Sequence, residues 1–196
     1  MTRDAERLAR AQERPVVGGL PEVPGIRVAM SLTPGLGVHL RGLADELLVH
    51  DYPGATIDRV DRELIATAVS AANDCFFCMD SHGAHAQAVM VANGRLDALP
   101  AIEVLKDGTS DGLDPKLAAL VHIARVVRRA PRELTTADTE AAMAAGASDG
   151  DVQLAVLIAA GFSMYNRMVD GFRACTAPSL EPYAARAVEI AARGYS

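Results

Sequence analysis

The sequence predicts an all-α protein that forms a single domain. Half of its 196 residues are hydrophobic, but it contains only four Phe, four Tyr and no Trp, so its core must be aliphatic and rich in Ala. Such a core favours close-packed helices over a β-sandwich. Apolar residues recur at helical spacing in several segments, and no segment alternates as a strand does. The length suits one compact domain covering residues 1–196.

The N-terminal part is predicted to be irregular. Residues 13–37 contain four Pro and five Gly, and this density of helix breakers disfavours long regular elements. We therefore interpret residues 1–37 as an irregular lead-in that wraps the domain. A first helix is expected over residues 38–50. The turn sequence Tyr52-Pro53-Gly54, which follows it, ends this helix.

Two helices are expected to form a hairpin over residues 56–94. In residues 56–73 the apolar positions follow a spacing of three and four, which marks one face of a helix. Asn73 and Asp74 interrupt this pattern, and Asp74 is a suitable N-cap for a helix beginning at Cys75. That helix should end at residues 93–94, where Asn-Gly is a common C-terminal cap.

Four more helices are predicted in the second half. Asp114-Pro115 opens one that stops before Pro131, and the next runs from residue 135 or 136 to 146. Ser148 and Asp151 resemble a capping box at the start of the longest helix, which reaches about residue 171. The last helix covers residues 181–193.

The pair Cys75 and Cys78 is the first candidate for chemistry. At the start of a helix, unpaired N–H groups and the positive end of the helix dipole favour a thiolate over a thiol. Residues three apart on a helix have Cβ atoms roughly 5–6 Å apart, so a modest adjustment would let a disulfide close. His82 follows on the same helical stripe, where its imidazole could exchange a proton with a thiol.

A carboxylate is expected to face this histidine. Glu63, Thr67 and Ser70 form a polar stripe on an otherwise apolar, Ala-rich helix. If the two helices pack as a hairpin, Glu63 can approach His82, fix its tautomer and stabilise its charged form. We hypothesise that Cys78 attacks a peroxide as a thiolate, becomes a sulfenic acid and is resolved to a disulfide by Cys75.

These residues carry a resemblance to a known family. Residues 62–73, with Cys75-Phe76-Phe77-Cys78 and His82, resemble the carboxymuconolactone decarboxylase-like superfamily, and within it the alkyl hydroperoxidase D and peroxidase-related branch. The shared pattern is Glu, eleven residues, CxxC, three residues and His. The likeness is strongest over residues 56–94.

The resemblance implies a helical fold that assembles into homo-oligomers, with no bound cofactor. It implies that Cys78 is the peroxidatic cysteine, Cys75 the resolving one, and Glu63 with His82 the proton relay. The expected partners are a hydroperoxide and a thiol or dithiol reductant, of lipoyl or thioredoxin type. One residue departs from the pattern: Phe77 stands where the hydroperoxidases have a histidine. His85, one turn beyond His82, is a potential partial substitute.

Alternatives remain open at this stage. One alternative is a zinc site formed by Cys75, Cys78 and His82, with Glu63 or water as the fourth ligand. Our first expectation is that the site binds no metal. The chain could instead be a structural or redox-sensing assembly, or a decarboxylase-like acid–base enzyme that uses Glu63 and His82 without sulfur. Cys175 is interpreted as a structural or incidental thiol, and the isolated histidines, His39, His50, His85 and His122, as surface histidines or histidines with satisfied hydrogen bonds. The basic cluster of Arg125, Arg128, Arg129 and Arg132 is interpreted as a solvated helix end.

Charge and hydropathy restrict the partners. With 19 basic and 25 acidic residues the formal charge is −6, which argues against a nucleic-acid-binding protein. The longest apolar run, residues 154–162, is far shorter than the roughly 20 residues of a membrane-spanning helix. The charged N-terminus does not resemble a secretory signal, so we expect a cytoplasmic location. Few aromatic residues and short helices favour burial against further copies of the chain.

Overall fold

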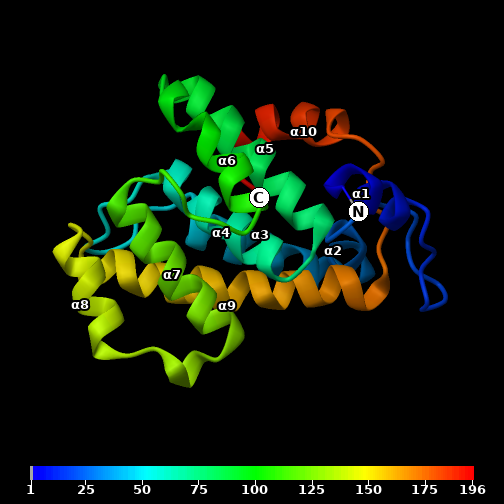
Figure 1. The fold of residues 1–196 in the computed structure, drawn as a ribbon. Coiled ribbons are helices and arrows are strands. Elements are labelled where there is room, and N and C mark those ends of the chain that lie inside the picture. Colours follow the sequence, from blue (N-terminus) through cyan, green and yellow to red (C-terminus); the bar gives the residue numbers. More distant parts are fainter. Residues whose placement is uncertain (1) are drawn as a thin grey trace.

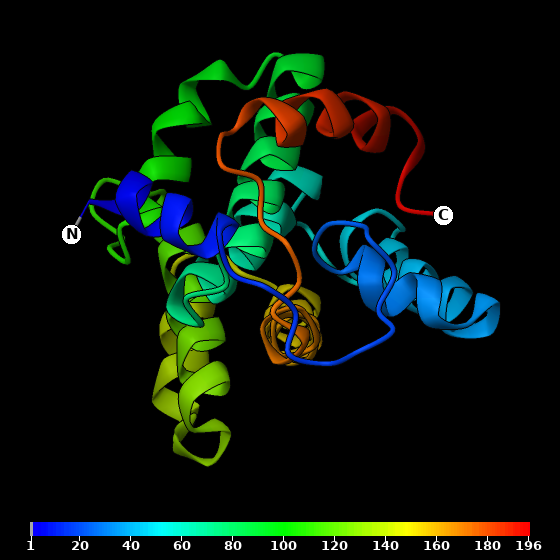
Figure 2. The same cartoon turned by 90° about the vertical axis from the view of Figure 1, so that its right-hand side faces the viewer.

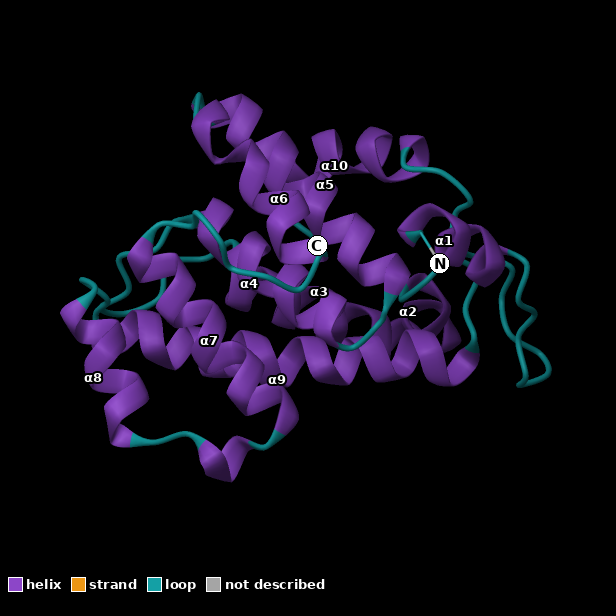
Figure 3. Ribbon diagram, in the orientation of Figure 1, coloured by secondary structure: helices purple, strands orange, loops and turns teal. Residues whose placement is uncertain are grey.

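The structure is a computed structural model, and it describes residues 2–196. These residues contain helices and no strand, which confirms the all-α prediction (Figures 1 and 3). The α-helices are α1 (Arg3–Ala11), α2 (Arg27–Leu32), α3 (Pro34–Leu48), α4 (Arg59–Ala72), α5 (Phe76–Asn93), α6 (Leu99–Lys106), α7 (Pro115–Arg129), α8 (Thr136–Ala144), α9 (Asp149–Phe172) and α10 (Glu181–Arg193). Short 3-10 turns lie at Leu96–Ala98 and Pro131–Glu133.

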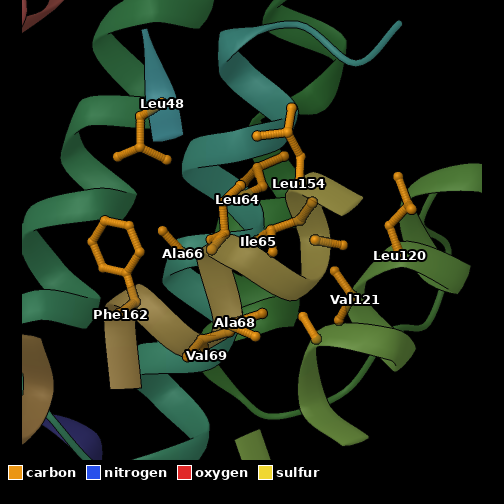
Figure 4. Packing of buried hydrophobic residues seen from close by; sticks show 14 of the residues in the cluster. Leu48, Leu64, Ile65, Ala66, Ala68, Val69, Leu120, Val121, Leu154 and Phe162 are labelled. Carbon is orange, nitrogen blue, oxygen red and sulfur yellow. The ribbon is translucent and has the colours of Figure 1, made fainter. Parts of the chain in front are cut away.

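Helix α4 forms the centre of the core. It packs against α5, α6, α7 and α9, and its residues 62–70 are all buried. Figure 4 shows its apolar side chains with Phe162 of α9 on one side and Leu120 and Val121 of α7 on the other. A helix surrounded on all sides belongs inside a domain, and each large aliphatic side chain buried there contributes about 1.5–3 kcal/mol. The polar residues on such a helix therefore need a specific reason to be there.

Helix α9 is the longest element and lies along the core, as the view down its axis shows (Figure 2). The predicted capping box is present: Ser148 Oγ accepts from the N–H of Asp151, and the Asp151 carboxylate accepts from the N–H of Ser148. By length and composition α9 could cross a membrane, but half of its most apolar window is buried inside the domain. Core helices pass the same test, so this is weak evidence for a membrane span.

The prediction of an irregular lead-in over residues 1–37 is wrong in three places. Helices α1 and α2 lie within it, and α3 begins at Pro34 rather than at residue 38. Proline at the first position of a helix has no N–H to lose, and Thr33 caps α3 through its hydroxyl, so this proline opens a helix. Helix α6 was not predicted either, and its Pro100 also lies in the first turn.

A buried ion pair attaches α1 to the domain. The guanidinium of Arg7 contacts the carboxylate of Asp80 on α5, with Nε 2.6 Å from Oδ2, and Lys106 Nζ lies 3.1 Å from the other oxygen. Asp80 is 1% exposed and Arg7 4%. A buried carboxylate is tolerated when cations and hydrogen bonds compensate its lost hydration. This ion pair thus holds α1 against α5, the helix that begins directly after Cys75 and contains Cys78.

The turn between α4 and α5 differs from its prediction by one residue. Asp74 is not the N-cap, because its backbone is left-handed with φ 56°, whereas an N-cap residue has an extended backbone. Cys75 occupies the N-cap position and α5 begins at Phe76. The N–H of Cys75 donates to the carbonyl of Ser70 at 3.0 Å. Helices α4 and α5 pack along each other as the expected hairpin.

Candidate active site

The two cysteines lie side by side at the N-terminal end of α5. Their side chains approach to 3.4 Å without a bond between them. Cys75 is fully buried and Cys78 is 3% exposed. The pKa of the Cys75 thiol is raised well above its ordinary value, first by its hydrogen bond with Cys78 and then by burial. Cys75 therefore keeps its proton and can share it with the Cys78 sulfur.

The N-terminal segment covers this pair. Leu20, Val23 and Ile26 pack on the cluster formed by the cysteines, Phe77 and Tyr183. Gly25 sits directly on the Phe77 ring: a Cβ at this glycine would lie 2.2 Å from the ring carbons. The N–H of Gly25 also donates to the carbonyl of Cys175 at 3.1 Å. The position that departs from the family pattern, Phe77, is thus a packing contact between α5 and the lead-in.

Glu63 and His82 meet across the hairpin. His82 Nδ1 lies 2.8 Å from Glu63 Oε2, and the Glu63 side chain is fully buried. Burial alone would raise the pKa of Glu63, but its interactions with His82 and the hydrogen bond from Tyr195 outweigh burial and lower that pKa. Glu63 is therefore a carboxylate at neutral pH. With Nδ1 engaged, Nε2 is the nitrogen of His82 that remains for proton exchange.

Two further residues join this pair. The hydroxyl of Tyr195 donates to Glu63 at 2.8 Å, and His85 Nδ1 lies 3.0 Å from the same hydroxyl. Burial lowers the pKa of His85 to about 3, so this imidazole is neutral. Burial and the neighbouring Glu63 carboxylate raise the pKa of Tyr195. The sequence signal for His85 was its position one turn after His82, whereas Tyr195 had no such signal.

The C-terminal residues are held over the site by Asp45 of α3. Its carboxylate accepts from the N–H of Tyr195 at 2.6 Å and from the hydroxyl of Ser196. Gly194 precedes them with φ 83°, and a Cβ there would lie 2.7 Å from Asp45 Oδ1. A glycine is therefore required for this close approach. Asp45 is a positioning residue that fixes the tyrosine hydroxyl beside Glu63.

Each polar side chain of the stripe on α4 makes a hydrogen bond. Thr67 donates to the carbonyl of Glu63 at 2.8 Å, and Ser70 accepts from Asn166 of α9 at 3.1 Å. Asn166 in turn accepts from Asn73 in the turn before the cysteines. Arg128 donates to the carbonyl of Ala72 at 2.7 Å. The interpretation of the basic cluster as a solvated helix end is therefore wrong for Arg128, which binds the C-terminal end of α4.

A cavity of about 320 Å³ opens beside Cys78. His82, His85 and Tyr195 line the same cavity, whereas Cys75 does not. Phe162 packs edge-on against the His82 ring, with the ring centroids 4.5 Å apart. A small molecule in this cavity would therefore reach one sulfur and one imidazole together.

Glu63, His82 and His85 are also the residues that could hold a metal ion. Their donor atoms lie within 4.8 Å of one another, and two imidazoles with a carboxylate suit a divalent transition metal. In this structure the carboxylate instead bonds directly to His82 and Tyr195. Among residues 2–196, no cluster of three such donors includes a cysteine. The zinc set of Cys75, Cys78 and His82 therefore gains no support.

The fold and this site define an all-helical protein with a CxxC pair next to a buried Glu–His pair. Residues 43–110 match the carboxymuconolactone decarboxylase family. No curated protein matches the sequence. The resemblance to the carboxymuconolactone decarboxylase-like superfamily is thereby confirmed for the part of the chain that carries the site.

Solved structures share the fold. One is an alkylhydroperoxidase AhpD core, an uncharacterized peroxidase-related protein from Ralstonia eutropha JMP134, with TM-score 0.68 and 23% identity over 85% of this chain and 82% of that one. Another is an uncharacterized peroxidase-related protein from Silicibacter sp. TM1040, with TM-score 0.66 and 22% identity over 89% and 93% of the two chains. At this identity the likeness establishes the fold alone.

Proposed function

We propose that the protein is a thiol-dependent hydroperoxidase whose dithiol is Cys75 and Cys78. The observation that carries the proposal is the asymmetry of the pair. Cys78 lines the cavity together with His82, whereas Cys75 lies behind it and holds its proton. Peroxide reduction by a dithiol needs this division between an attacking sulfur and a protonated resolving sulfur.

The first step oxidises Cys78. His82 Nε2 takes the Cys78 proton, and the imidazolium is stabilised by Glu63. The thiolate attacks the terminal oxygen of a hydroperoxide, the O–O bond breaks, and a sulfenic acid forms on Cys78. The leaving alkoxide receives the proton from His82. One hydroperoxide thereby becomes one alcohol.

The second step closes the disulfide. The sulfur of Cys75 attacks the sulfenic sulfur of Cys78 and releases water, with the Cys75 proton completing the water molecule. The short approach of the two side chains, 3.4 Å, suits this reaction. An external thiol or dithiol, of lipoyl or thioredoxin type, then supplies two electrons and two protons and restores both thiols.

Self-association belongs to this proposal. Leu36, Val38 and Leu43 are exposed on α3, and Leu157 on α9. Exposed apolar side chains on neighbouring helices favour burial against another copy of the chain. We expect a homo-oligomer in the cytoplasm, and light scattering tests the assembly: a mass near 20.6 kDa would refute it.

The proposal is tested by following the thiols and the turnover together. Thiol titration and intact mass before and after one equivalent of hydrogen peroxide should show the loss of two thiols and of two hydrogens. Turnover of tert-butyl hydroperoxide with dihydrolipoamide should be abolished in Cys78→Ser. The exposed third cysteine provides the matched control, since Cys175→Ser should keep full turnover. Unchanged turnover in Cys78→Ser would refute the mechanism.

A second candidate is an acid–base enzyme of the decarboxylase kind. It is favoured by the network of Glu63, His82 and Tyr195, which is complete without either sulfur. Such an enzyme would keep its activity on a lactone substrate when both Cys75 and Cys78 are replaced by Ser. The double variant therefore separates the two reactions.

A further inference from the structure

The cavity beside Cys78 has an unusual charge for this chain. Three arginines line it, Arg27 of α2, Arg41 of α3 and Arg186 of α10. They come from the consecutive helices α2 and α3 and from α10, which lies near the other end of the sequence. Among residues 2–196, no Asp or Glu lines the cavity, although the protein as a whole carries a formal charge of −6. Positive charge is thus concentrated at one place on an acidic protein.

Two of these arginines are free to bind a ligand. Arg186 is paired with Glu189 on the same helix. Within residues 2–196, the side chains of Arg27 and Arg41 have neither a hydrogen bond nor an ion pair. A guanidinium presents a planar fork of donors that matches the two oxygens of a carboxylate. The pair is therefore suited to an anionic group.

The rest of the lining is largely apolar. Met30, Ala44, Phe77, Phe162 and Ile190 contribute to the wall. The volume of about 320 Å³ lies at the lower end of the range for small-molecule sites, about 300–1,000 Å³. A ligand that contacts both parts of the wall has one charged end and one apolar chain.

We propose that this cavity binds a single-chain organic carboxylate, with its carboxylate at Arg27 and Arg41 and its chain along Phe77 and Phe162. Resting on the proposed function, the peroxide substrate is then a hydroperoxide that carries a carboxylate. The arginines hold the acid group and the apolar wall holds the chain, so that the hydroperoxy group reaches Cys78. Neutral hydroperoxides lack the first of these contacts and bind more weakly.

Binding is measured without any turnover, by isothermal titration calorimetry of the reduced full chain. The probes are decanoate, 1-decanol with the same chain and no charge, and acetate with the charge and no chain. Decanoate should bind at least about tenfold more tightly than 1-decanol, as a charge-assisted bidentate contact requires. Its affinity should fall as salt is raised. Equal affinities of decanoate and 1-decanol would overturn the proposal.

Arginine variants locate the anion. Arg27→Gln and Arg41→Gln should each weaken decanoate roughly tenfold and leave 1-decanol unchanged. Arg132→Gln removes an exposed arginine outside the cavity and should change neither. Thermal melts verify that each variant is folded. If the Arg132 variant weakens decanoate as much as the other two, the effect is one of overall charge and the site is refuted.

The outcomes separate this proposal from the proposed function. Binding of decanoate with no turnover of any hydroperoxide would leave the carboxylate site standing and refute the peroxidase. Turnover of tert-butyl hydroperoxide, with no preference for decanoate over 1-decanol, would do the opposite. Support for both would be a higher kcat/KM for a carboxylate-bearing hydroperoxide, lost in Arg41→Gln.

Discussion

The hydroxyl of Tyr195 donates to both carboxylate oxygens of Glu63, at 2.8 and 3.0 Å, although 132 positions separate the two residues. This contact adds to the hydrogen bond with His82, so that both oxygens of a carboxylate without solvent exposure have partners. Arg59 adds a cation, with its Nε 3.8 Å from Oε1. The last residues of the sequence are therefore part of the site formed by the α4–α5 hairpin.

Replacing Tyr195 by Phe removes one donor and keeps the ring. Leaving a buried acceptor without this partner costs the folded protein about 1–3 kcal/mol. Glu63 is then held less firmly against His82 in the transition state, and we expect turnover to fall roughly tenfold, which corresponds to about 1.4 kcal/mol on the activation barrier. The pKa of Glu63 should rise, because Tyr195 helps to lower it. The acidic limb of the profile of kcat/KM against pH should then move to higher pH, which a purely structural role would not cause.

The control for this variant is Tyr52→Phe. It also removes a tyrosine hydroxyl that makes a hydrogen bond, here to Gln153 at an exposed position. It should leave the pH profile unchanged. If Tyr195→Phe retains the wild-type profile and rate, Tyr195 has no part in the proton relay.

Replacing Glu63 by Gln tests the relay itself. The amide can still contact His82 but supplies no charge to stabilise the imidazolium. We expect turnover to fall by roughly 100-fold, within the range for general acid–base catalysis. Glu46 on α3 offers a matched comparison, because it also forms a Glu–His pair. Its Oε1 lies 3.0 Å from His50 Nδ1 at an exposed position. Glu46→Gln should keep full turnover, and a similar loss in both variants would contradict the relay.

The sequence predicts the residues of the site that share a short stretch of chain. Glu63, Cys75, Cys78 and His82 lie within two adjacent helices, so helical spacing and one turn suffice to relate them. Tyr195 and the arginines of the cavity come from α2, α3, α10 and the residues after it. Their places depend on how distant helices pack, and no local periodicity encodes that packing.

Short elements were missed for a related reason. Helices α1 and α2 contain nine and six residues, too few for a clear apolar repeat, and α1 is held by the buried contact of Arg7 with Asp80. Isolated helices of this length are marginal in water and gain their stability from tertiary contacts. Glycine and proline density predicted irregular chain there, whereas tertiary packing decided the outcome.

The protein should lose stability on acidification through His85. Its pKa is lowered by burial to about 3, against 6.5 for an ordinary histidine. The unfolded chain takes up a proton below pH 6.5 and the folded one does not. The contribution of neutral His85 to the free energy of unfolding is therefore complete above pH 6.5. It is lost as the pH falls towards 3, by up to about 1.4 kcal/mol per pH unit for one proton.

Urea unfolding at pH 7.5 and pH 5.0 measures this effect in wild type and in His85→Gln. The fall in stability between the two pH values should be smaller in the variant. His39→Gln removes an exposed histidine of α3 and should keep the wild-type fall. An identical fall in all three proteins would show that His85 takes up its proton over the same pH range in the folded and the unfolded protein, and would refute the prediction.

Replacing Gly25 by Ala should uncover the cysteine pair. The new Cβ would lie 2.2 Å from the ring of Phe77, so either the lead-in or the ring must move. We expect Cys78 to react several-fold faster with a thiol reagent, because opening of the lead-in limits access to this residue, which is only 3% exposed.

Gly19→Ala is the matched control. Gly19 lies in the same segment with φ 71°, against 58° for Gly25, and has no atom within 4 Å of its Cβ position. Both variants carry the cost of a left-handed alanine, about 1 kcal/mol, but only Gly25→Ala has the clash. Equal thiol reactivity in the two variants would mean that the lead-in does not control access to Cys78.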